Sequence, residues 1–407
     1  MRYKTLLTGC FALAAFLAGA GPANAQHNGS ANTTNYRELH QKAIVVDTHN
    51  DVLISVLEGL RLEDDLRGKT HSDLVRFKEG GVDVQIFSVW SDETYGKGKG
   101  FKFANLQIDS LNAIVGRNPD RMMIAKTPAD VMQAVQQNKM AAMIGVEGGH
   151  MIEDNLSYLE ELHKRGTSYM TLTWNNSTSW ATSAMDEASG KLPKSKRGLT
   201  KFGKQVVRKM NELGMMVDLS HVGERTFWDA IKTTSKPVLV SHSCVHSFNP
   251  HFRNLKDDQI KAIAKNGGVI HLNFFSGFLD PEYDQRMSQF RANHKAEVDS
   301  LRKLNKSSIE IYDWAKAHYP EEAATLRPPL SLLLDHLDHI VKLVGVDYVG
   351  LGSDFDGITS TPQQLDSVAD MPMITRELLA RGYSEEDIRK ILGENFLRVF
   401  RANMRGV

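Results

Sequence analysis

The feature that most restricts the fold of this chain is a regular alternation of short apolar runs with longer amphipathic stretches. Eight runs have the length and composition of buried strands: 43–46, 82–90, 141–146, 168–173, 214–219, 237–240, 268–274 and 348–351. The stretches between them have the apolar spacing of helices, and several end beside a glycine. Strands that alternate with helices pair in parallel through right-handed crossovers. We therefore expect an α/β fold, a (β/α)8 TIM-like barrel, although a doubly wound open sheet needs the same alternation.

The N-terminal segment differs in kind from the rest of the chain. A short basic start is followed by an apolar run to about Ala20 and by an Ala-x-Ala pattern that ends at Ala25. We expect residues 1–25 to be a signal peptide for the Sec route, residues 26–36 a flexible lead-in, and residues 37–405 a single catalytic barrel domain. The mature protein would be periplasmic or secreted, soluble and without a membrane anchor, because no other apolar stretch is long enough to span a bilayer.

Charge and chain organisation narrow the range of partners. The chain has 49 basic and 49 acidic residues and no long block of either sign, so we expect no nucleic acid partner. Residues 280–329, between the seventh and eighth expected strands, form a long charged insertion with helical character. This insertion could be a lid over the barrel mouth, a contact in a homodimer, or a solvated helical hairpin.

Polar residues follow five of the expected strands at their C-terminal ends, where barrel enzymes place their catalytic groups. They are His49, Asp51, Glu147, His221, His242 and Asp354. His49 and Asp51 are two positions apart, so their side chains point to the same side of an extended segment. Each residue alone could be a helix cap or a buried imidazole. Together they exceed the roughly three protein ligands of one catalytic zinc, and they favour a paired-metal site.

A series of motifs from about residue 40 to about residue 402 carries a more specific signal. The motifs are VDTHND at 46–51, GGV at 80–82 with FSVW at 87–90, GVEGG at 145–149, DLSH at 218–221, VSHS at 240–243, GSDFDG at 352–357 and GENFLRV at 393–399. In composition and order they resemble the membrane (renal) dipeptidase family of zinc metallopeptidases, within the amidohydrolase-like barrels. The resemblance implies a bacterial secreted member of that family.

The resemblance also implies a role for each strand-end ligand. His49 and Asp51 correspond to the ligands of a first zinc ion, and His221 and His242 to ligands of a second. Glu147 corresponds to the carboxylate that bridges both ions. The cofactor implied is therefore a pair of zinc ions.

The substrate side of the site matches the family only in part. Asp354 corresponds to the family's proton shuttle, and Arg253 to the clamp for the substrate's C-terminal carboxylate, a task that suits a bidentate guanidinium. After the fourth expected strand the well-studied members of the family have Thr-Leu-Thr-His, and that histidine contacts the substrate carbonyl. Here Trp174 stands in its place, and Asn175 or Asn176 could supply the missing donor.

These observations predict a zinc-dependent dipeptidase that hydrolyses short peptides with a free C-terminal carboxylate. A hydroxide that bridges the two metals would attack the amide, and Asp354 would carry the proton to the departing amine. Two alternatives stay open. The same site could act on a β-lactam or an N-acyl amino acid, since Trp174 could favour a bulkier substrate, or the chain could be a non-catalytic zinc-binding barrel, against which the retained Asp354 argues.

Overall fold

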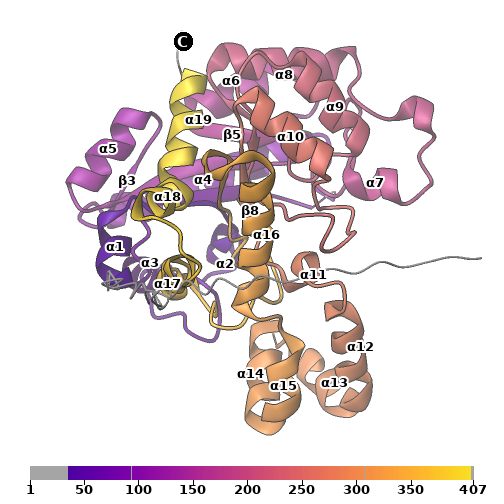
Figure 1. The fold of residues 1–407 in the computed structure, drawn as a ribbon. Helices are drawn as coiled ribbons and strands as arrows, with labels where there is room; N and C mark the ends of the chain where they lie inside the picture. Colours follow the sequence, from indigo (N-terminus) through magenta and orange to yellow (C-terminus); the bar gives the residue numbers. More distant parts are fainter. Residues whose placement is uncertain (1–34, 93, 307, 405–407) are drawn as a thin grey trace, which may run out of the picture. The chain divides into compact units, whose positions relative to one another are not determined.

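The computed structural model describes residues 35–92, 94–306 and 308–404 (Figure 1). These residues belong to one compact unit that begins at Asn35. The expected signal peptide and all but the last two residues of the expected lead-in lie outside the described residues. Helix α1 (Tyr36–Lys42) begins at the end of that lead-in, where the Asn35 side chain accepts a hydrogen bond from a backbone amide of the first turn.

Eight parallel strands close into a barrel. They are β1 (Val46–Asn50), β2 (Val84–Trp90), β4 (Met140–Glu147), β5 (Thr167–Thr171), β6 (Met216–Asp218), β7 (Leu239–Val240), β8 (Val269–Leu272) and β9 (Val349–Leu351). The order around the ring is β1-β2-β4-β5-β6-β7-β8-β9, and β9 pairs back with β1. All eight expected strands are therefore present in chain order, and the closed ring confirms the barrel over the open sheet.

One short strand, β3 (Met122–Ile124), was not expected. It pairs with the first three residues of β4. Because β2 pairs along one edge of β4, β3 must use the other edge, which β5 uses further along. A run of three residues is too short to show a strand period in a sequence.

Helices cover the outside of the barrel and follow the strands in chain order. They are α2 (Val52–Leu57), α3 (Leu74–Glu79), α4 (Gly100–Arg117), α5 (Pro128–Gln136), α6 (Leu156–Lys164), α7 (Ala184–Ala188), α8 (Lys201–Leu213), α9 (Glu224–Thr233), α10 (Asp257–Asn266), α11 (Ser276–Leu279), α16 (Leu330–Val344), α17 (Pro372–Ala380), α18 (Glu385–Arg389) and α19 (Asn395–Met404). Each of the longer helices buries one apolar face; in α8 this face includes Val206, Val207 and Met210. Among the described helices, none is both long and apolar enough to cross a bilayer.

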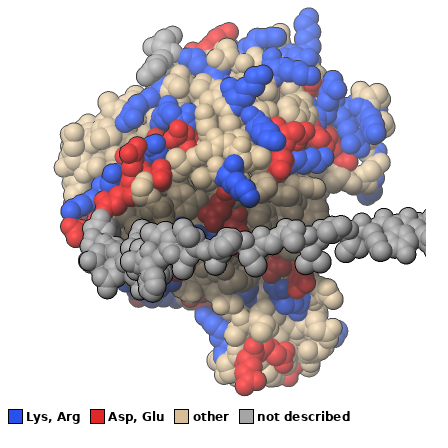
Figure 2. All heavy atoms as spheres, in the orientation of Figure 1, with Lys and Arg blue, Asp and Glu red and all other residues tan. Residues whose placement is uncertain are grey.

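The two ends of the barrel are closed by different chemistry. Near the strand starts, Val84, Met216 and Val269 belong to one apolar cluster with Phe396 and Phe400 of α19. The strand ends instead carry the polar side chains described below. Figure 2 shows acidic side chains in the hollow near the middle of the visible face, with basic and acidic side chains interspersed around it. Apolar packing thus fills the end of the barrel at the strand starts, and the polar side chains gather at the end where the strands finish.

The insertion between β8 and β9 is helical, as expected. It consists of α12 (Tyr283–Asn293), α13 (Lys295–Lys303), α14 (Ser308–His318) and α15 (Pro320–Leu326). Its core is separate from that of the barrel and includes Phe290, Val298 and Leu326. Figure 1 shows these four helices grouped as a lobe next to α11 and α16. Its role as a lid or a dimer contact stays a prediction.

Candidate metal centre and substrate pocket

The candidate metal ligands meet at the C-terminal mouth of the barrel, with Glu147 at the centre. Glu147 Oε1 lies 2.8 Å from His221 Nε2 and 3.5 Å from His242 Nε2. Glu147 Oε2 lies 3.3 Å from His49 Nε2. One carboxylate therefore faces imidazoles from three different strand ends, as a bridging ligand would.

His49 connects this group to two further carboxylates. Its Nε2 lies 3.4 Å from Asp51 Oδ2 and 4.0 Å from Asp354 Oδ1. His49, Asp51 and Asp354 have one ligand atom each within 4.8 Å of one another, and so do His49, Glu147 and His242. The structure thus brings together the residues that the strand ends predicted.

A tyrosine orients the His49 ring. Tyr169 Oη donates a hydrogen bond to the Thr48 carbonyl at 2.9 Å, so its oxygen accepts the proton on His49 Nδ1, also at 2.9 Å. This arrangement turns His49 Nε2 toward the carboxylates of Glu147 and Asp51. Such a hydrogen bond on the far nitrogen is typical of metal-binding histidines.

The rings of His221 and His242 are oriented in the same way, by a hydrogen bond at Nδ1. Ser241 Oγ donates to Asp218 Oδ2 at 2.6 Å and therefore accepts from His242 Nδ1 at 2.8 Å. His221 Nδ1 lies 3.1 Å from Asn175 Oδ1, which can only accept. Both histidines consequently turn the Nε2 lone pair toward Glu147.

The resulting cluster of acceptors fits a bound cation. His221 Nε2 and His242 Nε2 are 3.0 Å apart, and the buried His49 Nε2 has no hydrogen-bond partner among the described residues. Burial lowers the pKa of His221 to about 4 and holds the pKa of His242 well below its ordinary value, so both rings are neutral. Lone pairs and carboxylate oxygens at these distances repel one another unless a positive charge lies between them. Imidazole nitrogens and carboxylate oxygens are ligands for divalent metals.

The backbone around Asp354 is shaped for the site. Asp354 and His221 have φ angles of 62° and 63°, in the left-handed region that costs a non-glycine residue free energy. A Cβ on Gly357 would lie 2.2 Å from Asp51 Oδ2 and 2.6 Å from Asp354 Oδ1, so a side chain there would have to displace these two carboxylates. Burial raises the pKa of Asp354 well above its ordinary range, and Asn273 Nδ2 donates to its Oδ2 at 2.7 Å.

A cavity of about 470 Å³ opens beside these groups, and Arg253 is the cation in its wall. Arg253 is 5% exposed and donates to Ser243 Oγ at 3.3 Å and to the His242 carbonyl at 3.2 Å. Its Nε has no hydrogen-bond partner, and no carboxylate in the described part of the chain forms an ion pair with it. Burial lowers its pKa to about 10, so the guanidinium is charged at neutral pH. The cavity therefore offers an unpaired cation to an anion.

Trp174 and Asn175, at the position where the resemblance implies a histidine, also line this cavity. Trp174 packs edge-on against Trp90, with ring centroids 5.0 Å apart, and its ring lies 6.4 Å from that of His221. Asn175 lies beside it, with its amide oxygen engaged by His221, so its amide nitrogen is the donor it can offer elsewhere.

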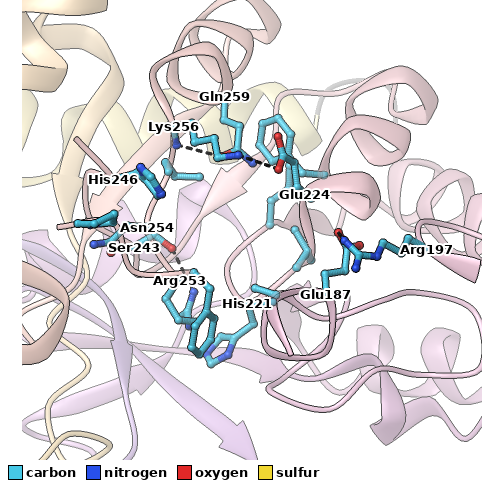
Figure 3. Close-up of a pocket in the computed structure, with 18 residues that line it drawn as sticks. Glu187, Arg197, His221, Glu224, Ser243, His246, Arg253, Asn254, Lys256 and Gln259 are labelled. Carbon is cyan, nitrogen blue, oxygen red and sulfur yellow. Dashed lines mark hydrogen bonds and ion pairs between the residues drawn. The ribbon is translucent and has the colours of Figure 1, made fainter. Parts of the chain in front are cut away.

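A second, smaller cavity of about 280 Å³ shares His221 and Arg253 with the first (Figure 3). Its lining includes charged side chains, and Lys256 Nζ pairs with Glu224 at 2.8 Å. In Figure 3, Arg253 and His221 lie together at one end of this cavity, with Glu224 and Lys256 at the other. The surroundings of Arg253 are thus polar on this side.

Comparison with known proteins agrees with this geometry. Residues 33–405 match the profile of the membrane dipeptidases, peptidase family M19. The chain belongs to this family. An uncharacterized dipeptidase of Schizosaccharomyces pombe is 32% identical over 387 residues, which are 90% of this chain and 82% of that protein.

Solved structures show the same fold. The probable dipeptidase PvdM from Pseudomonas aeruginosa has a TM-score of 0.75 at 25% identity, over 91% of this chain and 98% of that one. A metallo peptidase from Rhodobacter sphaeroides, solved with a phosphinate mimic of the dipeptide L-Ala-D-Ala, has a TM-score of 0.71 at 24% identity, over 89% of this chain and 99% of that one. The profile match and the curated relative confirm the expected family and its metallo-dipeptidase activity, and this member of the M19 family is a hydrolase of peptides.

Sequence reasoning missed the residues that orient the ligands. Tyr169 and Asp218 each interrupt an apolar run, and both are fully buried. A polar side chain inside a buried strand needs a partner, which was the available signal. The sequence could not name that partner, because His49 lies 120 residues away from Tyr169.

Proposed function

We propose that this M19 metallo-dipeptidase binds two zinc ions and cleaves dipeptides that have a free C-terminal carboxylate. His49 and Asp51 would hold one ion, His221 and His242 the other, and Glu147 would contact both. The observation that carries the proposal is the convergence of three Nε2 atoms on Glu147, with His221 and His242 only 3.0 Å apart. A mixed set of imidazole and carboxylate ligands suits zinc.

In the proposed reaction the protein contributes proton transfer and positioning. Bound metal ions would lower the pKa of a coordinated water and polarise the scissile carbonyl. Asp354 takes the proton of the attacking water and delivers it to the departing amine. Asn273 holds Asp354 Oδ2, so Oδ1 is the oxygen that faces the metal ligands.

Substrate binding is assigned to Arg253, Trp174 and Asn175. Arg253 pairs with the C-terminal carboxylate, because it is a buried guanidinium with an unused Nε and no carboxylate of its own. Asn175 directs its amide nitrogen at the substrate carbonyl and replaces the donor that the family has at position 174. Trp174 gives the same wall an apolar face.

The zinc-loaded mature protein and its Asp354→Asn variant test this proposal. We expect two zinc ions per chain in both proteins, and a kcat/KM for L-Ala-L-Ala and L-Ala-D-Ala that falls roughly 10²–10⁴-fold in the variant. Asp347→Asn, at an exposed site before β9, is the matched control and should keep its activity. Retained turnover in Asp354→Asn would contradict the assigned role, and fewer than two zinc ions would contradict the metal count. A β-lactam and an N-acyl amino acid in the same assay separate the two alternative substrates.

We also propose that the protein is exported by the Sec route, on the basis of the apolar run and Ala-x-Ala pattern in residues 1–25. The mature chain would begin at Gln26. Intact mass of the protein from the periplasm or the medium tests this, and a mass that includes Met1 would contradict it.

A further inference from the structure

We propose that Trp90 and Trp174 bind the side chain of the substrate's N-terminal residue and make the enzyme prefer dipeptides in which that residue is large and aromatic. The inference rests on the proposed dipeptidase function. It adds the substrate class and assigns a role in the site to Trp90, which belongs to the FSVW motif but had no role in it.

The two tryptophans form one continuous apolar wall. Trp90 is the last residue of β2, and Trp174 follows β5, yet their rings meet edge-on at 5.0 Å and 65°. Both line the cavity of about 470 Å³ that also contains Glu147 and Asp354. Edge-to-face packing is a favourable aromatic geometry, and the exposed ring faces can accept a third ring in the same way. A tryptophan where the family has a histidine thus replaces a polar contact with an apolar one.

The strand order decides which part of the substrate meets this wall. In the closed ring of eight strands, β2 and β7 are four positions apart and therefore lie across the mouth from each other. Trp90 ends β2, and Arg253 lies in the segment after β7. A dipeptide with its carboxylate on Arg253 and its amide at Glu147 therefore points its N-terminal residue toward Trp90 and Trp174. The reverse orientation would place the substrate's ammonium group against the guanidinium, which is unfavourable.

The other end of the substrate meets a different environment. Beside Arg253 the larger cavity is lined by Phe252, Phe275 and Phe278, and the smaller cavity behind it carries Glu187, Glu224 and Lys256 (Figure 3). A C-terminal side chain would therefore meet groups other than the two tryptophans. The preference assigned to Trp90 and Trp174 is expected at the N-terminal residue.

Two dipeptide series measured with the zinc-loaded protein test the inference. The first varies the N-terminal residue (Ala-Ala, Leu-Ala, Phe-Ala and Trp-Ala), and the second varies the C-terminal residue (Ala-Leu and Ala-Phe). We expect kcat/KM to rise about tenfold to a hundredfold from Ala-Ala to Phe-Ala, because an aromatic side chain leaves water for an aromatic wall. In the second series we expect the ratio of kcat/KM for Ala-Phe to that for Ala-Ala to be the same in the unmodified protein and in Trp174→Ala, because the C-terminal side chain lies away from the two tryptophans.

Substitutions of Trp174 test whether the tryptophan wall causes the preference for an aromatic N-terminal residue. In Trp174→Ala the ratio of kcat/KM for Phe-Ala to that for Ala-Ala should fall toward one, whereas Trp174→Phe should keep most of it. Trp228→Ala removes another half-buried tryptophan, on α9 and outside the cavity lining, and should leave the ratio unchanged. Circular dichroism of each variant shows whether it folds.

Calorimetric binding to zinc-loaded Asp354→Asn gives a readout that does not need turnover. Tighter binding of Phe-Ala than of Ala-Ala, lost in the double variant with Trp174→Ala, supports the inference. Equal binding of the two dipeptides, or equal kcat/KM values in a protein that cleaves Ala-Ala, overturns the inference and leaves the proposed dipeptidase function standing. Absence of any dipeptide cleavage overturns the proposed function, and the binding comparison then still decides the inference.

Discussion

At the scale of single residues, the candidate metal centre depends on which nitrogen of each of three imidazoles carries the proton. Each histidine donates a hydrogen bond from Nδ1 to a different kind of group. The acceptor is a phenol oxygen at His49, an amide oxygen at His221 and a serine hydroxyl at His242. All three therefore offer Nε2 to the same carboxylate. The hydrogen-bond acceptors on Nδ1, which are not themselves candidate ligands, thus decide that Nε2 is the nitrogen available to a metal ion.

Replacement of Tyr169 by phenylalanine should weaken metal binding without unfolding the protein. The Nδ1 proton of His49 would lose its acceptor, and the ring would be free to change tautomer. We expect zinc affinity to fall roughly tenfold or more, measured by competition with a chelator. Tyr383→Phe is the matched control, since it removes a hydroxyl that donates to Asp338 at 2.7 Å in the outer helices. Equal zinc affinity in the two variants would show that Tyr169 has no part in holding the ligand.

At the scale of elements, the turn after β9 is fastened to β1. Ser353 donates to Asp47 through its amide at 2.8 Å and through its hydroxyl at 2.6 Å. The amide of Asp354 donates to the His49 carbonyl at 3.1 Å. These hydrogen bonds therefore hold Asp354, the expected proton carrier, at a constant position relative to His49, the first expected metal ligand. A turn without such hydrogen bonds to β1 would not fix this position.

An alanine at Gly357 should disturb this turn. Its Cβ would collide with Asp51 and Asp354, and shifts of about 1 Å at reacting groups can cost roughly a hundredfold in rate. We expect kcat/KM to fall by at least tenfold, with a lower zinc content. Gly116→Ala is the control, because a Cβ there meets nothing within 4 Å in the helix α4. It should keep full activity and gain roughly 0.5–1 kcal/mol in stability. Unchanged kcat/KM in Gly357→Ala would contradict the steric argument.

At the scale of the whole molecule, groups that affect only stability lie at the opposite end of the barrel from the candidate metal ligands. Asp83, just before β2, accepts a hydrogen bond from the Val45 amide at 2.8 Å, at the end of the barrel opposite to the metal centre. Burial raises the pKa of Asp83 to about 6 from an ordinary value of 3.8. The folded state therefore holds a proton that the unfolded state has already released between about pH 4 and pH 6. The contribution of Asp83 to stability falls as the pH rises through this window.

Asp83→Asn should remove the loss of stability that accompanies ionisation of the Asp83 carboxyl at rising pH. Asparagine can still accept the hydrogen bond but does not ionise, so at pH 8 the variant should be more stable by at most roughly 3 kcal/mol. Urea unfolding at pH 4, 6 and 8 measures the difference, which should shrink toward acid pH. Asp120→Asn, with a side chain that is 79% exposed at the same end of the barrel, is the control for a change in charge alone. Dipeptidase activity should stay the same in both, and a stability gain that does not depend on pH would contradict the assignment to the Asp83 carboxyl.

The sequence alone determined the eight strands, their alternation with helices and the candidate metal ligands, whereas the closure of the ring through β9 and β1 came from the tertiary structure. Apolar runs and helical spacing are local patterns, and in a closed parallel sheet all strand ends share one mouth, so His49, Glu147 and His242 had to meet once the strands were identified. Only the tertiary structure decided which side chains surround the candidate ligands and hold them in place. It showed Tyr169 against His49, Trp90 against Trp174 and β3 on the edge of β4. These contacts join residues far apart in the chain, and their geometry depends on how side chains pack, which no local pattern encodes.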